Sequence, residues 1–129
     1  MKLALALMLV PGLALAETPL SGAEFDARTV GRTMTYARGG EVWGREVYLR
    51  DRKVIWAFDG EPCKRGTWQE PQPGLICFSY DDAPQDQECW RFYDREGGLF
   101  AQSELAPEEG DLAAVEQSEA GLVCDGLGA

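Results

Sequence analysis

Cys77 and Cys89 bear most directly on chemistry, because they flank an acidic turn in the segment GLICFSYDDAPQDQECWRFY (74–93). A redox site usually has a C-x-x-C motif with a readily ionised thiol, whereas these cysteines lie twelve residues apart and no two of the four are closer. A zinc site would need all four thiolates, because the chain has no histidine, and no pair of them has the short spacing of zinc ligands. The spacing therefore favours a structural disulfide.

The acidic turn offers oxygen ligands for Ca²⁺ from Asp81, Asp82, Asp86 and Glu88. Their spacing differs from that of an EF-hand loop, and Pro84 interrupts the group. We expect a solvated hairpin tip and no metal or other cofactor.

The strand register around this turn predicts the cysteine pairing. If 74–80 and 88–93 run antiparallel with Cys77 opposite Cys89, the two cysteines share one face, and Ile76 pairs with Trp90 on the apolar face. Cross-strand neighbours have Cβ atoms about 4.5–5.5 Å apart, which is close to disulfide geometry.

Cys63 would then pair with Cys124. The rival arrangement, Cys63–Cys77 with Cys89–Cys124, stays open because 63–69 can also align with 75–80. Agreement with the apolar face favours the first.

The absence of histidine removes Ser-His-Asp and Cys-His catalysis and imidazole as a base. We therefore assign no catalytic residue and expect no enzyme. The alternative is a carboxylate enzyme acting on glycans, with Asp59, Glu61 and Glu46 as candidates near strand ends. Such an enzyme needs two acids about 5–10 Å apart in a cleft, and a buried acid with a raised pKa would favour it.

Residues 1–16, MKLALALMLVPGLALA, have the layout of a secretory signal peptide, with Lys2 before a short apolar run and Ala14-Leu15-Ala16 as a cleavage signal. The run is too short to span a bilayer. We expect cleavage after Ala16, export to the periplasm or medium of a bacterium, and no membrane insertion afterwards. In that compartment an even number of cysteines predicts two disulfides.

The acidic composition limits the possible partners. The chain has a net charge of −10, and loss of Lys2 with the signal makes it one unit more negative. General electrostatics will therefore not bring it to nucleic acid or to an anionic membrane. No basic residue follows Arg95. We interpret 104–129 as a solvated acidic tail partly tied back by Cys124; the alternative is an acidic lip for a cationic ligand.

Hydrophobic periodicity predicts one mainly β domain over 17–129. Residues 21–31 should form a short helix, because Ser21 and Glu24 make a capping box, and Phe25 should pack onto a sheet. Strands are expected at 32–37, 42–50, 53–58, 64–69, 75–80, 88–93 and 99–102, with a possible edge strand at 112–117 and a break at 71–74. Short strands with turn signals between them indicate an antiparallel meander that forms a small barrel or sandwich.

Large aromatic residues occur in nearly every strand. Most should fill the core, but some could line a ligand cavity or a binding face. The candidate binding aromatics are Trp43, Tyr48, Trp56, Trp68 and Trp90.

Several short motifs, among them LSGAEF (20–25), GRTMTY (31–36), C-x-x-G-x-W (63–68) and C-W-x-F (89–92), resemble those of a group of small, secreted, cysteine-containing β-proteins of alphaproteobacteria. The likeness covers most of 20–93 and the late cysteine. It implies an exported bacterial β-protein and supplies no activity.

We expect a monomeric, exported, non-enzymatic β-domain that binds a protein partner or a small apolar ligand. A closed barrel with an apolar lumen would favour the ligand. A filled core with an exposed aromatic patch would favour the protein partner. An envelope structural or stress protein without a specific ligand is a further alternative.

Overall fold

The computed structural model describes residues 16–122 and Cys124. The expected signal peptide over 1–16 therefore lies almost wholly outside the described residues, as does the end of the acidic tail. The first described element is α1 (Gly22–Thr29). The remaining elements, in chain order, are β1 (Thr33–Arg38), β2 (Glu41–Tyr48), η1 (Arg50–Arg52), β3 (Lys53–Phe58), β4 (Lys64–Gln72), β5 (Leu75–Tyr80), β6 (Glu88–Arg95), β7 (Gly98–Ser103), η2 (Pro107–Glu109) and β8 (Leu112–Ser118).

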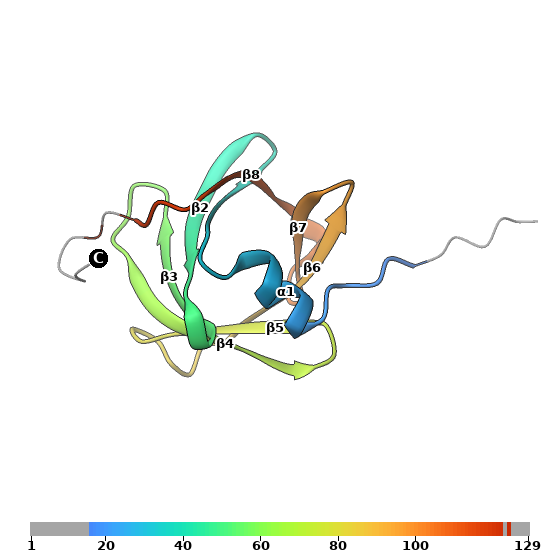
Figure 1. Cartoon of the computed structure of the whole chain (residues 1–129), viewed down its shortest axis with the longest axis horizontal. Helices are drawn as coiled ribbons and strands as arrows, with labels where there is room; N and C mark the ends of the chain where they lie inside the picture. The colour runs from blue at the N-terminus through green and yellow to red at the C-terminus, as the bar shows by residue number, and fades with distance from the viewer. Residues whose placement is uncertain (1–15, 123, 125–129) are drawn as a thin grey trace, which may run out of the picture.

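The strands form a closed antiparallel barrel in which each strand pairs with its neighbour in sequence and β8 pairs back with β1. Figure 1 shows the strands as a ring, with α1 lying across the middle of the view. The predicted β meander is confirmed, and of the two arrangements expected it is the barrel. Each strand therefore has a partner on both sides, although β5 with β6 and β7 with β8 pair over only three and two residue pairs.

The strand β8 closes the barrel. The sequence predicts an edge strand at 112–117, but the structure places β8 between two partners, with Ala113 opposite both Phe100 of β7 and Ala37 of β1. A short, weakly apolar segment is enough here, because Leu112 is its only buried residue and Ala114 is partly buried against the core.

The predicted break at 71–74 is shorter than expected, because β4 runs on to Gln72. Its pairing with β5 shifts between Gln69 and Gln72, on either side of Pro71. Proline cannot donate a ladder hydrogen bond, so an irregular register allows the strand to continue past it.

The helix α1 has the predicted capping box, in which Ser21 Oγ accepts from the Glu24 amide and Glu24 Oε1 accepts from the Ser21 amide. The helix also inserts Phe25 into the barrel, where the side chain is fully buried. The Phe25 ring lies edge-on to Trp68, at 5.2 Å between centroids, and 4.3 Å from Phe92. The helix therefore closes one end of the barrel.

Glu70, near the end of β4, anchors this helix. Its Oε2 accepts hydrogen bonds from the amides of Gly22, at 2.7 Å, and Gly74, at 2.9 Å. These two bonds lower the pKa of the Glu70 carboxyl, with the larger effect from Gly74. A carboxylate is also favourable at the first residue of a helix because of the helix dipole.

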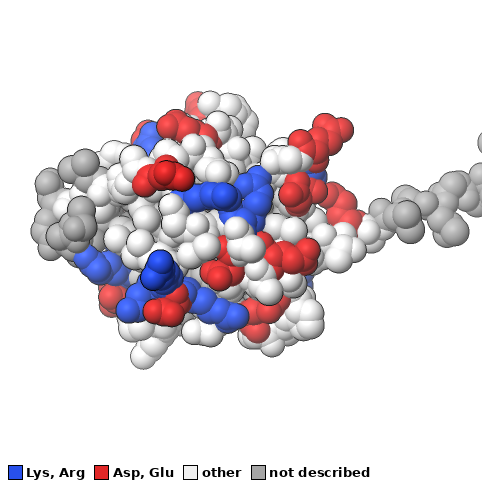
Figure 2. Space-filling view, in the orientation of Figure 1, with Lys and Arg blue, Asp and Glu red and all other residues white. Residues whose placement is uncertain are grey.

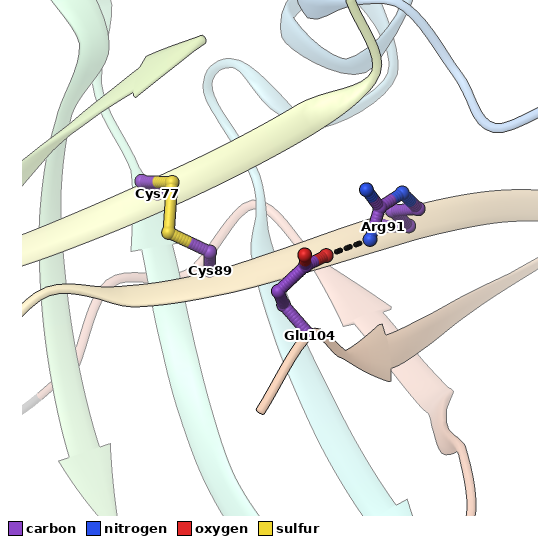
Figure 3. The surroundings of a disulfide bond; sticks show 4 residues. All are labelled: Cys77, Cys89, Arg91 and Glu104. Carbon is purple, nitrogen blue, oxygen red and sulfur yellow. Dashed lines mark hydrogen bonds and ion pairs between the residues drawn. A yellow bond between two sulfur atoms is a disulfide. The ribbon is translucent and has the colours of Figure 1, made fainter. Parts of the chain in front are cut away.

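Both predicted disulfides form. Cys77 and Cys89 lie opposite each other on β5 and β6 with Cα atoms 4.0 Å apart, and Ile76 pairs with Trp90 in the predicted register. Figure 3 shows this bridge between the two strands, with the Arg91–Glu104 ion pair farther along β6. Cys63 and Cys124, with Cα atoms 5.6 Å apart, join the start of β4 to the segment after β8. The rival pairing is therefore excluded.

None of the described helices has the length and hydropathy that a membrane-spanning helix needs. On the face that α1 covers, basic and acidic side chains are interspersed without a single-sign field (Figure 2). Arg95 forms ion pairs with both Glu17 and Asp111. This pairing ties the segment before α1 to the start of β8.

Candidate functional site

The lumen of the barrel contains a cavity of about 70 Å³ on the side away from α1. The helix closes the end of the barrel where β2 and β4 finish. The cavity reaches the opposite end, where β2, β4, β6 and β8 begin and where β3 and β5 finish. One water molecule needs about 10–15 Å³ of such space, so the cavity is large enough for a small organic group. Its lining consists of Tyr36, Trp43, Glu46, Tyr48, Trp56, Phe58, Lys64, Phe78, Tyr80, Glu88, Trp90, Phe92, Ala101 and Leu112.

Strand alternation places these side chains in the lumen. Glu46 and Tyr48 are two residues apart on β2, as are Trp56 and Phe58 on β3, so each pair points to the same side of the sheet. Gly66 on β4 provides space for Tyr80, because a Cβ there would lie 2.7 Å from Tyr80 Cδ1. Position 66 therefore has no room for a side chain beside the Tyr80 ring.

Glu46 is the only acidic residue among the described residues that is buried, with 2% of its surface exposed. Its Oε1 accepts a hydrogen bond of 2.9 Å from the Tyr80 hydroxyl, whereas Oε2 is buried and has no hydrogen-bond partner in the described part of the chain. Burial raises the pKa of this carboxyl well above its usual value, the Tyr80 hydrogen bond opposes the shift, and the charge of Glu88 adds to it. Burial therefore favours the neutral form of the Glu46 carboxyl.

Two tyrosines lie next to Glu46 in the lumen. The hydroxyl oxygens of Tyr36 and Tyr48 are 2.7 Å apart and hydrogen-bonded. Burial raises the pKa of both phenols and also that of Tyr80. The three hydroxyls therefore stay neutral, and they supply dipoles rather than charges to the lumen.

Aromatic rings form the wall toward the open end. The Trp43 ring centroid lies 5.2 Å from those of Trp56 and Phe58, and 5.8 Å from that of Trp90. A second cavity of about 170 Å³ shares Trp43, Glu88 and Trp90 with the first and also contacts Leu105. The two indoles of Trp43 and Trp90 thus stand between the lumen and a hollow on the outside.

Four of the five candidate binding aromatics come together here. Trp43, Tyr48, Trp56 and Trp90 line the lumen cavity, but Trp68 does not. Trp68 lies on the α1 side, 1% exposed, between the Phe25 ring and the guanidinium of Arg52, which is 4.5 Å from its centroid. Trp68 is a core residue of the closed end.

Sequence reasoning did not assign Tyr36, Phe58, Tyr80 or Glu88 to the site, and it named Glu46 only as a possible glycan-cleaving acid. The sequence does contain a sign that Glu46 points into the barrel. Glu46 is on the same strand face as Tyr48, whereas Val47 and Leu49 are on the other face. A glutamate on an otherwise apolar strand face is an unusual residue to bury.

The other two candidate acids do not converge on Glu46. Asp59 is exposed and pairs with Arg45 at 3.1 Å. Glu61 is exposed and lies with Cys63 and Asp82 along a separate surface groove. The carboxylate that does share the lumen with Glu46 is Glu88.

No group of three or more cysteine, aspartate or glutamate side chains arranged to hold a metal ion occurs within residues 16–122 and Cys124. In the acidic turn, Asp82 pairs with Lys64 at 3.1 Å. The turn itself is mostly exposed.

The fold and the lumen define a small, closed, disulfide-linked β-barrel with an aromatic cavity sealed at one end by a helix. Comparisons with protein-family models, with curated proteins and with solved structures find no match to the chain. The function must therefore be inferred from the lumen itself.

Proposed function

We propose that this chain is an exported, non-enzymatic protein that binds a small ligand in the lumen of its barrel. The observation that carries the proposal is Glu46, which is buried in an aromatic cavity with Oε2 lacking a hydrogen-bond partner among the described residues. Small-molecule sites are concave and mostly apolar, with a few polar groups that fix the ligand. The lumen has this composition.

A small ligand accounts for the lumen better than a protein partner does. Trp43, Trp56 and Trp90 contribute to an inward cavity rather than to an exposed aromatic patch. The large apolar residues that are exposed, such as Leu105 and Val115, occur singly along the described chain, and single exposed apolar residues are ordinary on protein surfaces.

The proposed location is the bacterial periplasm or the medium. Its support is the signal-like sequence of residues 1–16 together with the two disulfides, since disulfides persist in oxidising compartments. Mass spectrometry of the intact exported protein tests this part. Cleavage after Ala16 and a gain of about 4 Da on reduction of two disulfides are expected.

A carboxylate enzyme acting on glycans is the second candidate, because Glu46 is a buried acid with a raised pKa. The size of the lumen argues against it. A cavity of about 70 Å³ is far below the about 300–1,000 Å³ of pockets that enclose ligands of drug size, and a glycan chain would have to enter between Trp43 and Trp90. Ligand binding therefore remains the preferred proposal.

Native mass spectrometry of the protein recovered from its own export compartment tests ligand binding. We expect a species heavier than the oxidised mature chain, with the excess mass released on denaturation. Ala101→Leu is the matched variant, because Ala101 lines the lumen and is 2% exposed, so the added side chain fills the cavity. The variant should lose the excess mass. A bare chain for the native protein would overturn the proposal, and retention by the variant would exclude the lumen.

A further inference from the structure

The unpartnered oxygen of Glu46 indicates which chemistry a ligand must bring. Buried polar atoms in proteins almost always have a hydrogen-bond partner, and an exception needs an explanation. Oε1 of Glu46 is satisfied by Tyr80, whereas Oε2 has no partner within the described residues. Glu46 is also one of the residues that line the cavity, which places its carboxyl at the wall of the lumen. When the carboxyl is ionised, both oxygens can only accept, so the matching ligand group is a donor.

Two aromatic rings of the cavity wall already have a cation beside them. The guanidinium carbon of Arg38 lies 5.5 Å from the Trp43 ring centroid, and Lys64 Nζ lies 5.6 Å from that of Phe58. Both distances are within the range of a cation–π attraction. The rings that surround the cavity are therefore placed to attract positive charge, which an aliphatic wall would not do.

The charges at the cavity also favour a cation. Besides Glu46, the lining residues with acidic or basic side chains are Glu88 and Lys64, and the Lys64 ammonium is paired with Asp82 at 3.1 Å. No ion pair to Glu46 or Glu88 occurs in residues 16–122. Among the lining residues, an anionic ligand would therefore meet only one cation, and that cation is already paired.

We propose that the lumen binds a small organic ammonium ion whose N–H donates to Glu46 Oε2 and whose hydrocarbon part lies against the indoles of Trp43, Trp56 and Trp90. This inference rests on the proposed function and specifies its ligand class. The cavity volume limits the buried part of the ligand to a few heavy atoms.

Binding of such an ion is coupled to a proton. Without a ligand, burial raises the pKa of Glu46 and favours its protonated form, and the bound ammonium displaces this proton to form a charge-assisted hydrogen bond. The groups that face Glu46 are the neutral phenols of Tyr36, Tyr48 and Tyr80 and the charged Glu88 and Lys64. The proton that we assign to this coupling is that of Glu46, the buried carboxyl of the lumen. Affinity should therefore rise about tenfold per pH unit below the pKa of Glu46 in the ligand-free protein.

The test uses three probes of matched length, which are n-butylammonium, butan-1-ol and butyrate, and it follows the indole N–H resonances of the four tryptophans by NMR. Trp68 serves as an internal reference, because it lies outside the cavity at the α1 end. We expect n-butylammonium to shift the Trp43, Trp56 and Trp90 resonances, with the two other probes binding at least about tenfold more weakly, the weight of one charge-assisted hydrogen bond. The affinity for n-butylammonium should increase as the pH is raised toward the pKa of Glu46.

Glu46→Gln and Glu41→Gln provide the matched variants. Both change one glutamate on β2, but Glu41 is exposed at the start of the strand. Glu46→Gln should weaken n-butylammonium binding at least about tenfold and remove its pH dependence, whereas Glu41→Gln should bind as the unmodified protein does. If butan-1-ol binds as tightly as n-butylammonium and still binds to Glu46→Gln, the ammonium proposal is overturned and the lumen is a site for neutral ligands. If none of the probes shifts an indole resonance, the lumen is not a ligand site and both proposals fail.

Discussion

Tyr80 donates a hydrogen bond of 2.9 Å to Glu46 Oε1, and this bond joins β5 to β2 across the lumen. The two strands are not neighbours in the barrel, so the contact is made through the interior. It satisfies one oxygen of a carboxyl that is otherwise surrounded by aromatic rings. The barrel thus has a polar group in a region that packing alone would make apolar. The effect of this group on the free energy of unfolding depends on pH.

Glu46→Gln should stabilise the protein, and more so at high pH. The pKa of Glu46 is raised in the folded state by burial, so the folded chain binds more protons than the unfolded chain between the two pKa values. Stability from this group is therefore fully present below the unfolded pKa of about 4.3 and decreases as pH rises, by up to about 1.4 kcal/mol per pH unit. Glutamine keeps an uncharged acceptor for Tyr80 and does not titrate.

Urea unfolding of the two chains from pH 4 to pH 8 measures this effect. The free energies of unfolding should agree within about 0.5 kcal/mol at pH 4, as for a nearly isosteric change, and should diverge as pH rises. Glu41→Gln is the control, because its carboxyl is exposed. Parallel pH profiles for Glu46→Gln and the unmodified chain would show that Glu46 is not buried as described.

The effect of Glu70→Gln on the free energy of unfolding should have the opposite pH dependence to that of Glu46→Gln. The amides of Gly74 and Gly22 hold the pKa of the Glu70 carboxyl below its usual value, so its contribution is present above the unfolded pKa and is lost as pH falls through the folded pKa. At pH 7 the variant should lose about 1–2 kcal/mol, because it weakens hydrogen bonds to a charged acceptor at a helix start. The loss should shrink toward pH 3. The exposed Glu108→Gln is the control, and a loss that stays constant with pH would contradict the charged role.

The local features of this fold were predictable because neighbouring residues specify them. Ser21 and Glu24 predict the start of α1, and the alternation around Cys77 and Cys89 fixes both the register of β5 with β6 and the disulfide. In each case the residues that interact lie within a dozen positions of each other. The capping geometry or the two-residue period of a strand then leaves few alternatives.

The lumen was less predictable because its composition depends on depth along the barrel axis. Trp56, Trp68 and Trp90 all point inward, yet Trp68 lies under α1 and the other two line the cavity. Alternation indicates the inward face of a strand, but the stagger between strands sets the height of each residue. The contact between Glu46 and Tyr80 likewise requires the full circuit of the barrel, which β8 completes.

Removal of the Cys63–Cys124 disulfide should cost more stability than removal of Cys77–Cys89. The two bridges close loops of 61 and 12 residues, and the chain-entropy model assigns about 4 kcal/mol to the longer loop and about 3 kcal/mol to the shorter one. In addition, β5 and β6 stay paired through their ladder without a bridge. Thermal unfolding of the Cys63→Ala/Cys124→Ala and Cys77→Ala/Cys89→Ala chains measures the difference. The reverse order would mean that packing around the buried Cys77 outweighs loop entropy.

Phe25→Ala should destabilise the barrel by about 3–5 kcal/mol, as is typical for removal of a buried phenylalanine. The Phe25 ring is fully buried and lies 5.4 Å from Tyr48, 5.2 Å from Trp68 and 4.3 Å from Phe92, measured between centroids. Its loss opens a cavity beneath α1 and leaves the opposite end of the barrel unchanged. In a chain that still folds, the indole resonance of Trp68 should therefore move much more than that of Trp90.

Leu105→Ala provides the comparison for the Phe25 variant, because Leu105 is 81% exposed. Its substitution should change the free energy of unfolding by less than about 0.5 kcal/mol. Phe25→Leu should lie between the two, since leucine retains most of the buried apolar surface but none of the ring contacts. A loss below about 1 kcal/mol for Phe25→Ala would mean that the barrel does not depend on the helix. The end that α1 covers would then be a second candidate entrance to the lumen.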